Sequence, residues 1–187
     1  MKHLDSIIRL GVVFAFFSLQ PFTTFTQERE EVFGTNTGQL KITAIVADTV
    51  FRATTKELIV ILNYQTAEFT LILDKADIIT GNDSLNNLLD QRRGEKISFT
   101  GSMNLPYIKQ EKHPPKDIEI SGYLSTDKDK NEVLGEGRLE YLYNGRYASM
   151  LIMSFILDVN KMGINIHLPG LEDQIQVELT KAVLNSQ

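Results

Sequence analysis

The chain has 187 residues, a formal net charge of −5, and hydrophobic and charged contents of 42% and 23%, which are typical of a soluble globular protein. The absence of cysteine excludes disulfides, thiolate metal sites, cysteine nucleophiles and lipid attachment to a cysteine. The acidic balance argues against a nucleic-acid partner, which requires a concentrated basic surface.

The N-terminus predicts a secretory signal peptide over residues 1–26. Lys2 and Arg9 give a basic start, residues 10–19 form an uncharged apolar run, and small residues precede a cleavage site after Thr26. The run is too short to span a membrane, which takes about 20 apolar residues. A buried N-terminal helix is the structural alternative.

We therefore expect an exported protein, periplasmic or secreted, without a membrane span. Residues 27–37 are predicted to form an N-terminal extension, and residues 38–187 are long enough for one domain of ordinary size. No later stretch approaches the length of a membrane helix.

Period-two alternation dominates this domain and predicts antiparallel strands with one apolar face. In Lys96–Met103, for example, Ile97, Phe99 and Met103 share one face. Asn144-Gly145 is a strong hairpin signal between two such runs. The predicted strands cover residues 39–47, 57–63, 67–74, 96–103, 117–125, 132–142, 147–158 and 173–184.

One segment, residues 82–91, has helical spacing instead. Leu85, Leu88 and Leu89 fall on one face, Asn82 or Asp83 can cap the first turn, and Gly94 can end the helix. We expect this short amphipathic helix to press its leucine face onto the sheet, as a lid or a side wall.

Eight antiparallel strands can form a sandwich or close into a barrel, whose interior is either packed with side chains or lined for one small ligand. Residues 148–157 are apolar on both alternating faces. A strand covered by the leucine helix, the wall of an apolar cavity, and a self-association surface would each give this pattern.

Catalytic and metal-binding patterns are weak. His113 and His167 have no partner at metal spacing, and residues 127–138 lack the glycine and glutamate of a calcium loop. Gly135 and Gly137 are explained better by strand bends than by a nucleotide loop. No cofactor, metal or catalytic residue is therefore assigned, although a carboxylate pair stays open.

Three stretches resemble the YceI-like family of exported, lipocalin-like antiparallel barrels. Residues 82–101 resemble the family's helix followed by its "x-phenylalanine-x-glycine" strand, although Gly94-Glu95 replaces the family's tyrosine-proline. Residues 162–179 are similar to its turn, its "isoleucine-x-isoleucine-proline" segment and its last strand, and 118–124 to a third strand. The resemblance implies an eight-stranded lipocalin-like barrel that binds amphiphiles such as polyisoprenoids or fatty-acyl derivatives.

The resulting hypothesis is an exported, non-catalytic protein that holds a long apolar or isoprenoid ligand inside the barrel. A filled, self-associating barrel, such as a homodimer through 147–158, and a carboxylate-dependent hydrolase are the alternatives. The predicted pocket lining is Phe69, Leu71, Leu73, Leu85, Leu88, Phe99, Met103, Ile120, Leu124, Leu151, Met153 and Phe155.

Overall fold

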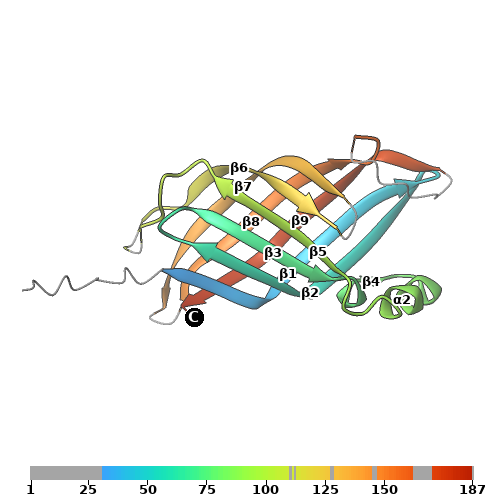
Figure 1. Ribbon diagram of the computed structural model, residues 1–187, viewed down its shortest axis with the longest axis horizontal. Helices are drawn as coiled ribbons and strands as arrows, with labels where there is room; N and C mark the ends of the chain where they lie inside the picture. The colour runs from blue at the N-terminus through green and yellow to red at the C-terminus, as the bar shows by residue number, and fades with distance from the viewer. Residues whose placement is uncertain are drawn as a thin grey trace, which may run out of the picture.

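The computed structural model describes residues 31–109, 111, 113–126, 129–144, 147–161 and 170–186. Within these residues, eight long strands form an antiparallel barrel in the order β1-β9-β8-β7-β6-β5-β3-β2, and β1 pairs with β2 to close the ring (Figure 1). Closure decides between the sandwich and the barrel that the alternation left open. The expected signal peptide, residues 1–26, lies outside the described residues.

Each predicted strand overlaps an observed one. The segment between β3 and β5 also contains a 3₁₀ turn η1 (Lys75–Asp77), the two-residue strand β4 (Ile79–Thr80) and the helix α2 (Asp83–Asp90). The strands are β1 (Val32–Val46), β2 (Thr49–Asn63), β3 (Glu68–Asp74), β4 (Ile79–Thr80), β5 (Lys96–Met103), β6 (Lys116–Ser125), β7 (Lys130–Asn144), β8 (Tyr147–Asp158) and β9 (Leu171–Ser186).

The first strand begins earlier than expected. Residues 32–37 belong to β1, so the barrel starts before the predicted boundary at 38 and includes most of the predicted extension. The pairing of β1 with β2 shifts register on both sides of Gly38. Such bulges insert extra residues and interrupt the period of two, which hides the strand from a search for alternation.

Register places the apolar side chains of neighbouring strands in common layers of the interior. Leu71 on β3 lies opposite Phe99 on β5, and Phe99 lies opposite Leu124 on β6. Between the first and last strands, Leu40 of β1 lies opposite Leu179 of β9. One contiguous hydrophobic core therefore fills the ring from all of its long strands.

The strand β8 is apolar on both faces, but only its inner face is buried. Leu151, Met153 and Phe155 point inward and are 0%, 1% and 5% exposed, whereas Ile156 on the outer face is 58% exposed. The expectation that the leucine helix covers this outer face is wrong. The main contacts of α2 are with η1 and β4, at one end of the barrel (Figure 1).

The helix α2 has the predicted N-cap but not the predicted packing. The Asn82 side chain accepts a hydrogen bond from Leu85 N at 3.0 Å, and Gly94 adopts a φ of 91° shortly after the helix ends. No residue of α2 is buried, and Leu88 is 57% exposed. The helix therefore packs beside η1 and the short strand β4 rather than pressing its leucine face onto the long strands.

The hairpin between β7 and β8 agrees with the Asn144-Gly145 signal. Asn144 pairs with Tyr147, while Gly145 and Arg146 lie outside the described residues. Among the described residues, no helix has the length and apolar character needed to cross a membrane.

Candidate functional site

The candidate site is the apolar interior of the barrel, because most of the predicted lining residues meet there. Leu124 is half-buried and packs against the buried core. Leu85 and Leu88 lie on α2 instead, half-buried and exposed respectively, outside the interior wall. The predicted residues that belong to the buried core are Phe69, Leu71, Leu73, Phe99, Met103, Ile120, Leu151, Met153 and Phe155.

Three phenylalanine rings form a ladder across the interior. The ring centroids of Phe69 and Phe99 are 5.2 Å apart at an interplanar angle of 70°, and those of Phe99 and Phe155 are 5.0 Å apart. These are favourable edge and tilted arrangements of aromatic pairs. The rings need the space left by Gly101 and Gly122, where an added Cβ would lie 3.0 Å from Phe69 Cζ and 2.9 Å from Phe99 Cε2.

The end of the barrel where β1 starts and β9 finishes, here called the terminal end, is closed by Tyr64. The Tyr64 hydroxyl is hydrogen-bonded to the Ser149 side chain, which is 0% exposed. The ring centroids of Tyr64 and Phe33 are 4.1 Å apart. The backbone carbonyl of Tyr64 accepts a hydrogen bond from Ile108 N at 2.7 Å. Burial raises the pKa of Tyr64 above its usual value, so the phenol keeps its proton to a higher pH than an exposed tyrosine does. The hydrogen-bonded pair of Tyr64 and Ser149 is here called the plug.

Sequence reasoning did not find this plug. Its signal is Ser149, which stands on the inward face of β8 together with the apolar Leu151, Met153 and Phe155. A lone hydroxyl on an otherwise dry face indicates a buried hydrogen bond, because an unpaired polar group there would be costly. The partner, Tyr64, lies too far away in the sequence to be inferred.

At the opposite end of the barrel, here called the α2 end, several apolar side chains are only half-buried. Interior side chains near the terminal end and at mid-barrel, such as Leu139 and Leu151, are 0% exposed. Towards the α2 end, Leu124, Ile175 and Ile78 are only half-buried, although they still pack against the core. Apolar surface is therefore partly exposed at the α2 end, as it also is at Phe33 and Leu105 near the terminal end, where the Tyr64–Ser149 pair lies beneath it.

The interior presents apolar surface and hydroxyls rather than charge. Among the described residues, the buried polar side chains besides Tyr64 are Thr55, Thr80 and Ser149, and no carboxylate or histidine is buried. No group of three or more His, Cys, Asp or Glu in this part of the chain is arranged to hold a metal ion. His113 lies in the β5–β6 loop with its ring 5.7 Å from that of Tyr141.

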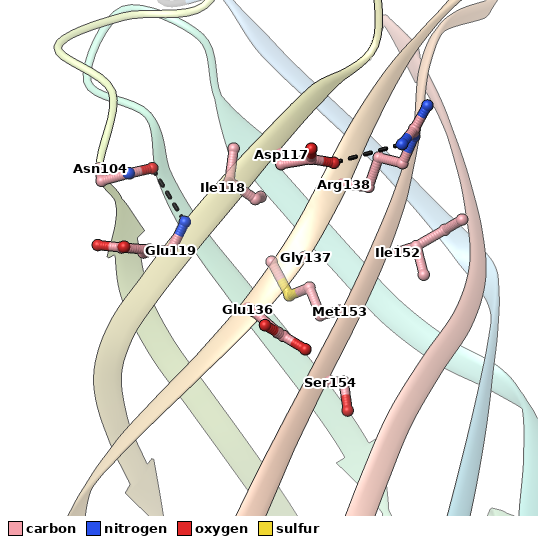
Figure 2. Close-up of a pocket in the computed structure, with 10 residues that line it drawn as sticks. All are labelled: Asn104, Asp117, Ile118, Glu119, Glu136, Gly137, Arg138, Ile152, Met153 and Ser154. Atoms are coloured by element: carbon pink, nitrogen blue, oxygen red, sulfur yellow. Dashed lines mark hydrogen bonds and ion pairs between the residues drawn. The ribbon is translucent and has the colours of Figure 1, made fainter.

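An outer groove of about 560 Å³ crosses β6, β7 and β8 (Figure 2). Three of its polar side chains, those of Asn104, Asp117 and Arg138, are engaged with protein groups. Arg138 contacts Asp117 at 3.3 Å and Glu140 at 3.0 Å, and the Asn104 amide oxygen accepts from Glu119 N at 3.0 Å. This charged groove, on the face opposite the interior, does not suit an apolar chain.

Neither a protein-family model nor a curated protein sequence matches this chain. Solved structures do. A domain from Saccharophagus degradans, described as polyisoprenoid-binding and implicated in plant cell wall breakdown, is 10% identical with a TM-score of 0.62, covering 85% of this chain and 100% of that domain. BcnA from Burkholderia cenocepacia is 10% identical with a TM-score of 0.56, covering 80% and 96%.

These similarities define the class of fold. The chain is an eight-stranded, lipocalin-like antiparallel barrel with one short helix. Its fold is that of the YceI-like barrels, as the resemblance in the sequence predicted.

Proposed function

We propose that the protein is a non-catalytic carrier that holds an amphiphilic isoprenoid or fatty-acyl ligand in the barrel, with the apolar chain entering at the α2 end. The observation that carries this proposal is the asymmetry of the apolar interior. Tyr64 and Ser149 close one end, while half-buried apolar side chains such as Leu124 and Ile175 line the other. The polyisoprenoid-binding description of one structural neighbour supports the same ligand class.

The ligand must displace side chains that now touch each other. Met103 and Met153 are 5% and 1% exposed, and unbranched methionines can change rotamer to admit a flexible chain. Each buried methylene of the ligand contributes about 0.8 kcal/mol, so a chain of many methylenes can compensate for this rearrangement. Binding then needs few polar contacts, in agreement with the uncharged interior.

A filled barrel that binds no ligand is the second candidate, and a specific observation favours it. Leu139, Leu151 and Leu179 are 0% exposed, so the middle of the interior is packed. In that case the functional surface is external. The exposed Leu134 and Ile156 on β7 and β8 would then form the self-association surface.

We also propose that the barrel works outside the cytoplasm after removal of residues 1–26. An aqueous compartment beside a membrane is where a carrier of water-insoluble chains is useful. N-terminal sequencing of protein recovered from the culture medium or the periplasm tests this, and we expect the mature chain to begin at Gln27.

Native mass spectrometry tests the ligand. The mature protein is analysed as purified, and again after incubation with geranylgeraniol or palmitic acid. We expect a bound lipid, either carried through purification or acquired from these probes. If no lipid copurifies and neither probe binds, the carrier is excluded and the filled barrel remains.

Two tryptophan substitutions locate the binding route. Leu124→Trp places a large ring at the α2 end of the interior, and we expect about tenfold weaker probe binding. Leu134→Trp is the matched control, because Leu134 is 67% exposed on the outside of β7. Circular dichroism establishes that both variants fold. Equal binding by the two folded variants would contradict entry at the α2 end.

A further inference from the structure

A second outer groove, here called the hydroxyl groove, has a volume of about 590 Å³ and lies over β3, β5 and β6. Strand register builds it from two rows of outward side chains. Thr70 lies opposite Thr100, which lies opposite Tyr123, and in the next row Ser102 lies opposite Ser121. The outward residues alternate with the inward Phe69, Leu71 and Phe99, so the groove and the interior are on opposite faces of the same strands. The remaining outward groups that line it include Asn63, Glu68 and Glu132.

The four aliphatic hydroxyls of this groove are unengaged. Within the part of the chain that the structure describes, the side chains of Thr70, Thr100, Ser102 and Ser121 have no hydrogen-bond partner. Each hydroxyl can donate one hydrogen bond and accept others. Strands are spaced about 4.8 Å apart, so the four hydroxyls form a regular array that offers donors and acceptors side by side. A ligand that carries many hydroxyls of its own would satisfy such an array.

Tyr123 adds an apolar platform at the edge of the array. Its side chain is 48% exposed and lines the groove. The Lys130 ammonium lies 4.5 Å from its ring centroid, in a cation–π contact with one face of the ring. An exposed aromatic ring beside hydrogen-bonding groups can stack on the C–H face of a sugar ring while the hydroxyls bind its edges.

The charges in the groove narrow the ligand class. Glu68 on β3 and Glu132 on β7 both line it, on opposite sides of the hydroxyl array. These two carboxylates outnumber the one ammonium beside Tyr123, that of Lys130, so the groove disfavours phosphate or acidic sugars, while the carboxylates can accept hydrogen bonds from neutral hydroxyls. An apolar chain would leave the array unsatisfied.

The groove of Figure 2 has a different lining, with Ser154 as the one hydroxyl-bearing residue among those that line it. Its Arg138, Asp117 and Asn104 side chains already bind protein groups, as described above.

We propose that the hydroxyl groove is a binding site for a neutral oligosaccharide, with Tyr123 as the stacking platform and Thr100, Ser102 and Ser121 as hydrogen-bonding groups. The site is separate from the barrel interior, so the protein can hold a saccharide and a lipid at the same time.

The test is an NMR titration of the mature, ¹⁵N-labelled protein with three neutral probes, cellohexaose, xylohexaose and mannohexaose. We expect at least one of them to shift the backbone amides of residues 68–70, 100–102 and 121–123. The acidic probe hexagalacturonic acid is expected to bind more weakly. Tighter binding of the acidic probe, or no shifts in these residues with any neutral probe, would overturn the proposal.

Two matched tyrosine variants identify the platform. We expect Tyr123→Ala to weaken binding of the best probe by about tenfold. Tyr107→Ala is the control, since Tyr107 is exposed to a similar extent, 51%, but lies outside the groove. Equal losses in the two variants would refute the role of Tyr123.

A second pair of variants tests the hydroxyls without changing side-chain shape. Thr100→Val removes a hydroxyl of the groove, whereas Thr54→Val removes an exposed hydroxyl on β2 outside it. We expect a several-fold loss of saccharide affinity only in Thr100→Val. Lipid binding, measured on the same variants by native mass spectrometry, is expected to stay unchanged, and a parallel loss would show that the two sites are not separate.

Discussion

Gly101 and Gly122 lie directly opposite each other on β5 and β6, where the two backbones approach closely. A Cβ on Gly101 would lie 2.3 Å from Ser121 O, 2.9 Å from Gly122 Cα and 3.0 Å from Phe69 Cζ. The oxygen and the Cα belong to the neighbouring strand, so neither can move unless that strand bends. Only glycine therefore fits at this position.

We expect Gly101→Ala to destabilise the barrel by about 1–3 kcal/mol, because overpacking forces backbone shifts. Urea unfolding followed by circular dichroism measures the change. Gly81→Ala is the matched control, because an added Cβ there meets no atom within 4 Å. A midpoint for Gly101→Ala equal to that of the control would contradict the close approach.

The buried hydroxyl of Tyr64 contributes to the stability of the barrel. Its hydroxyl is bonded to a fully buried Ser149, and burial raises its pKa. Tyr64→Phe removes only the hydroxyl and leaves the Ser149 side chain buried without this partner. We expect a loss of about 1–3 kcal/mol in the free energy of unfolding at neutral pH.

The pH dependence of that loss has a definite sign. Because the folded pKa is raised, the unfolded chain releases the Tyr64 proton first, at a pH of about 10, while the folded chain keeps it. The extra stability of the wild type over Tyr64→Phe is therefore full below about pH 9 and shrinks as the pH rises through the folded pKa. Urea unfolding of both proteins across this range tests the sign, and a constant difference would contradict it.

At the scale of an element, the segment between β3 and β5 is held by local hydrogen bonds rather than by burial. The Asn86 side chain accepts from Thr80 N and from Thr80 Oγ1, each at 2.8 Å, and donates to Thr80 O at 3.1 Å. The Asp74 carboxylate accepts hydrogen bonds from Ala76 N at 3.0 Å and from Gly94 N at 2.9 Å. The bond from Ala76 N is the main cause of the lowered pKa of Asp74, and the bond from Gly94 N lowers it further. The segment can therefore loosen while the barrel stays folded.

Asn86→Ala should uncouple α2 from β4. We expect faster amide hydrogen exchange over residues 80–93, with little change in the urea midpoint of the whole barrel. Asn87→Ala is the neighbouring control, because the Asn87 side chain is exposed and takes no part in this network. Exchange measured by mass spectrometry that is equally fast in both variants would show that the contacts with Thr80 do not hold the helix.

At the scale of the whole molecule, ring closure brings the two ends of the described chain together. β1 and β9 are antiparallel neighbours, with Phe33 opposite Ser186 and Gly34 opposite Asn185 (Figure 1). The tight β1–β2 turn lies at the other end, with positive φ at Ala47 and Asp48. The barrel therefore has no unpaired strand at either end of its chain.

A circular permutant tests this closure. Ser186 is joined to Val32 by a short glycine linker, and new termini are opened between Ala47 and Asp48. We expect a folded barrel with a single cooperative urea transition, since the opening interrupts only a turn. Opening the chain between Leu151 and Ile152, inside β8, is the control, and this permutant should not fold because β8 pairs with both neighbours. Loss of folding in the first permutant would contradict the closed ring.

Local sequence patterns were sufficient for most of the fold and for much of the candidate site. Phe69, Phe99 and Ile120 alternate with polar neighbours, so their inward direction followed from strand period alone. The cap of α2 was equally visible, because Asn82 and Leu85 are three residues apart. The early part of β1 was missed because its bulges around Gly38 break the period.

What the sequence by itself determined is therefore the set of strands, the short helix and the apolar inner face. Only the tertiary structure decided the pairing of the first strand with the last through Leu40 and Leu179, the hydrogen bond of Tyr64 with Ser149, and which apolar face of β8 is buried. The physical reason is the range of the interactions. Alternation and capping are set by residues a few positions apart, whereas closure, plug and choice of face depend on contacts between distant strands, which no local pattern encodes.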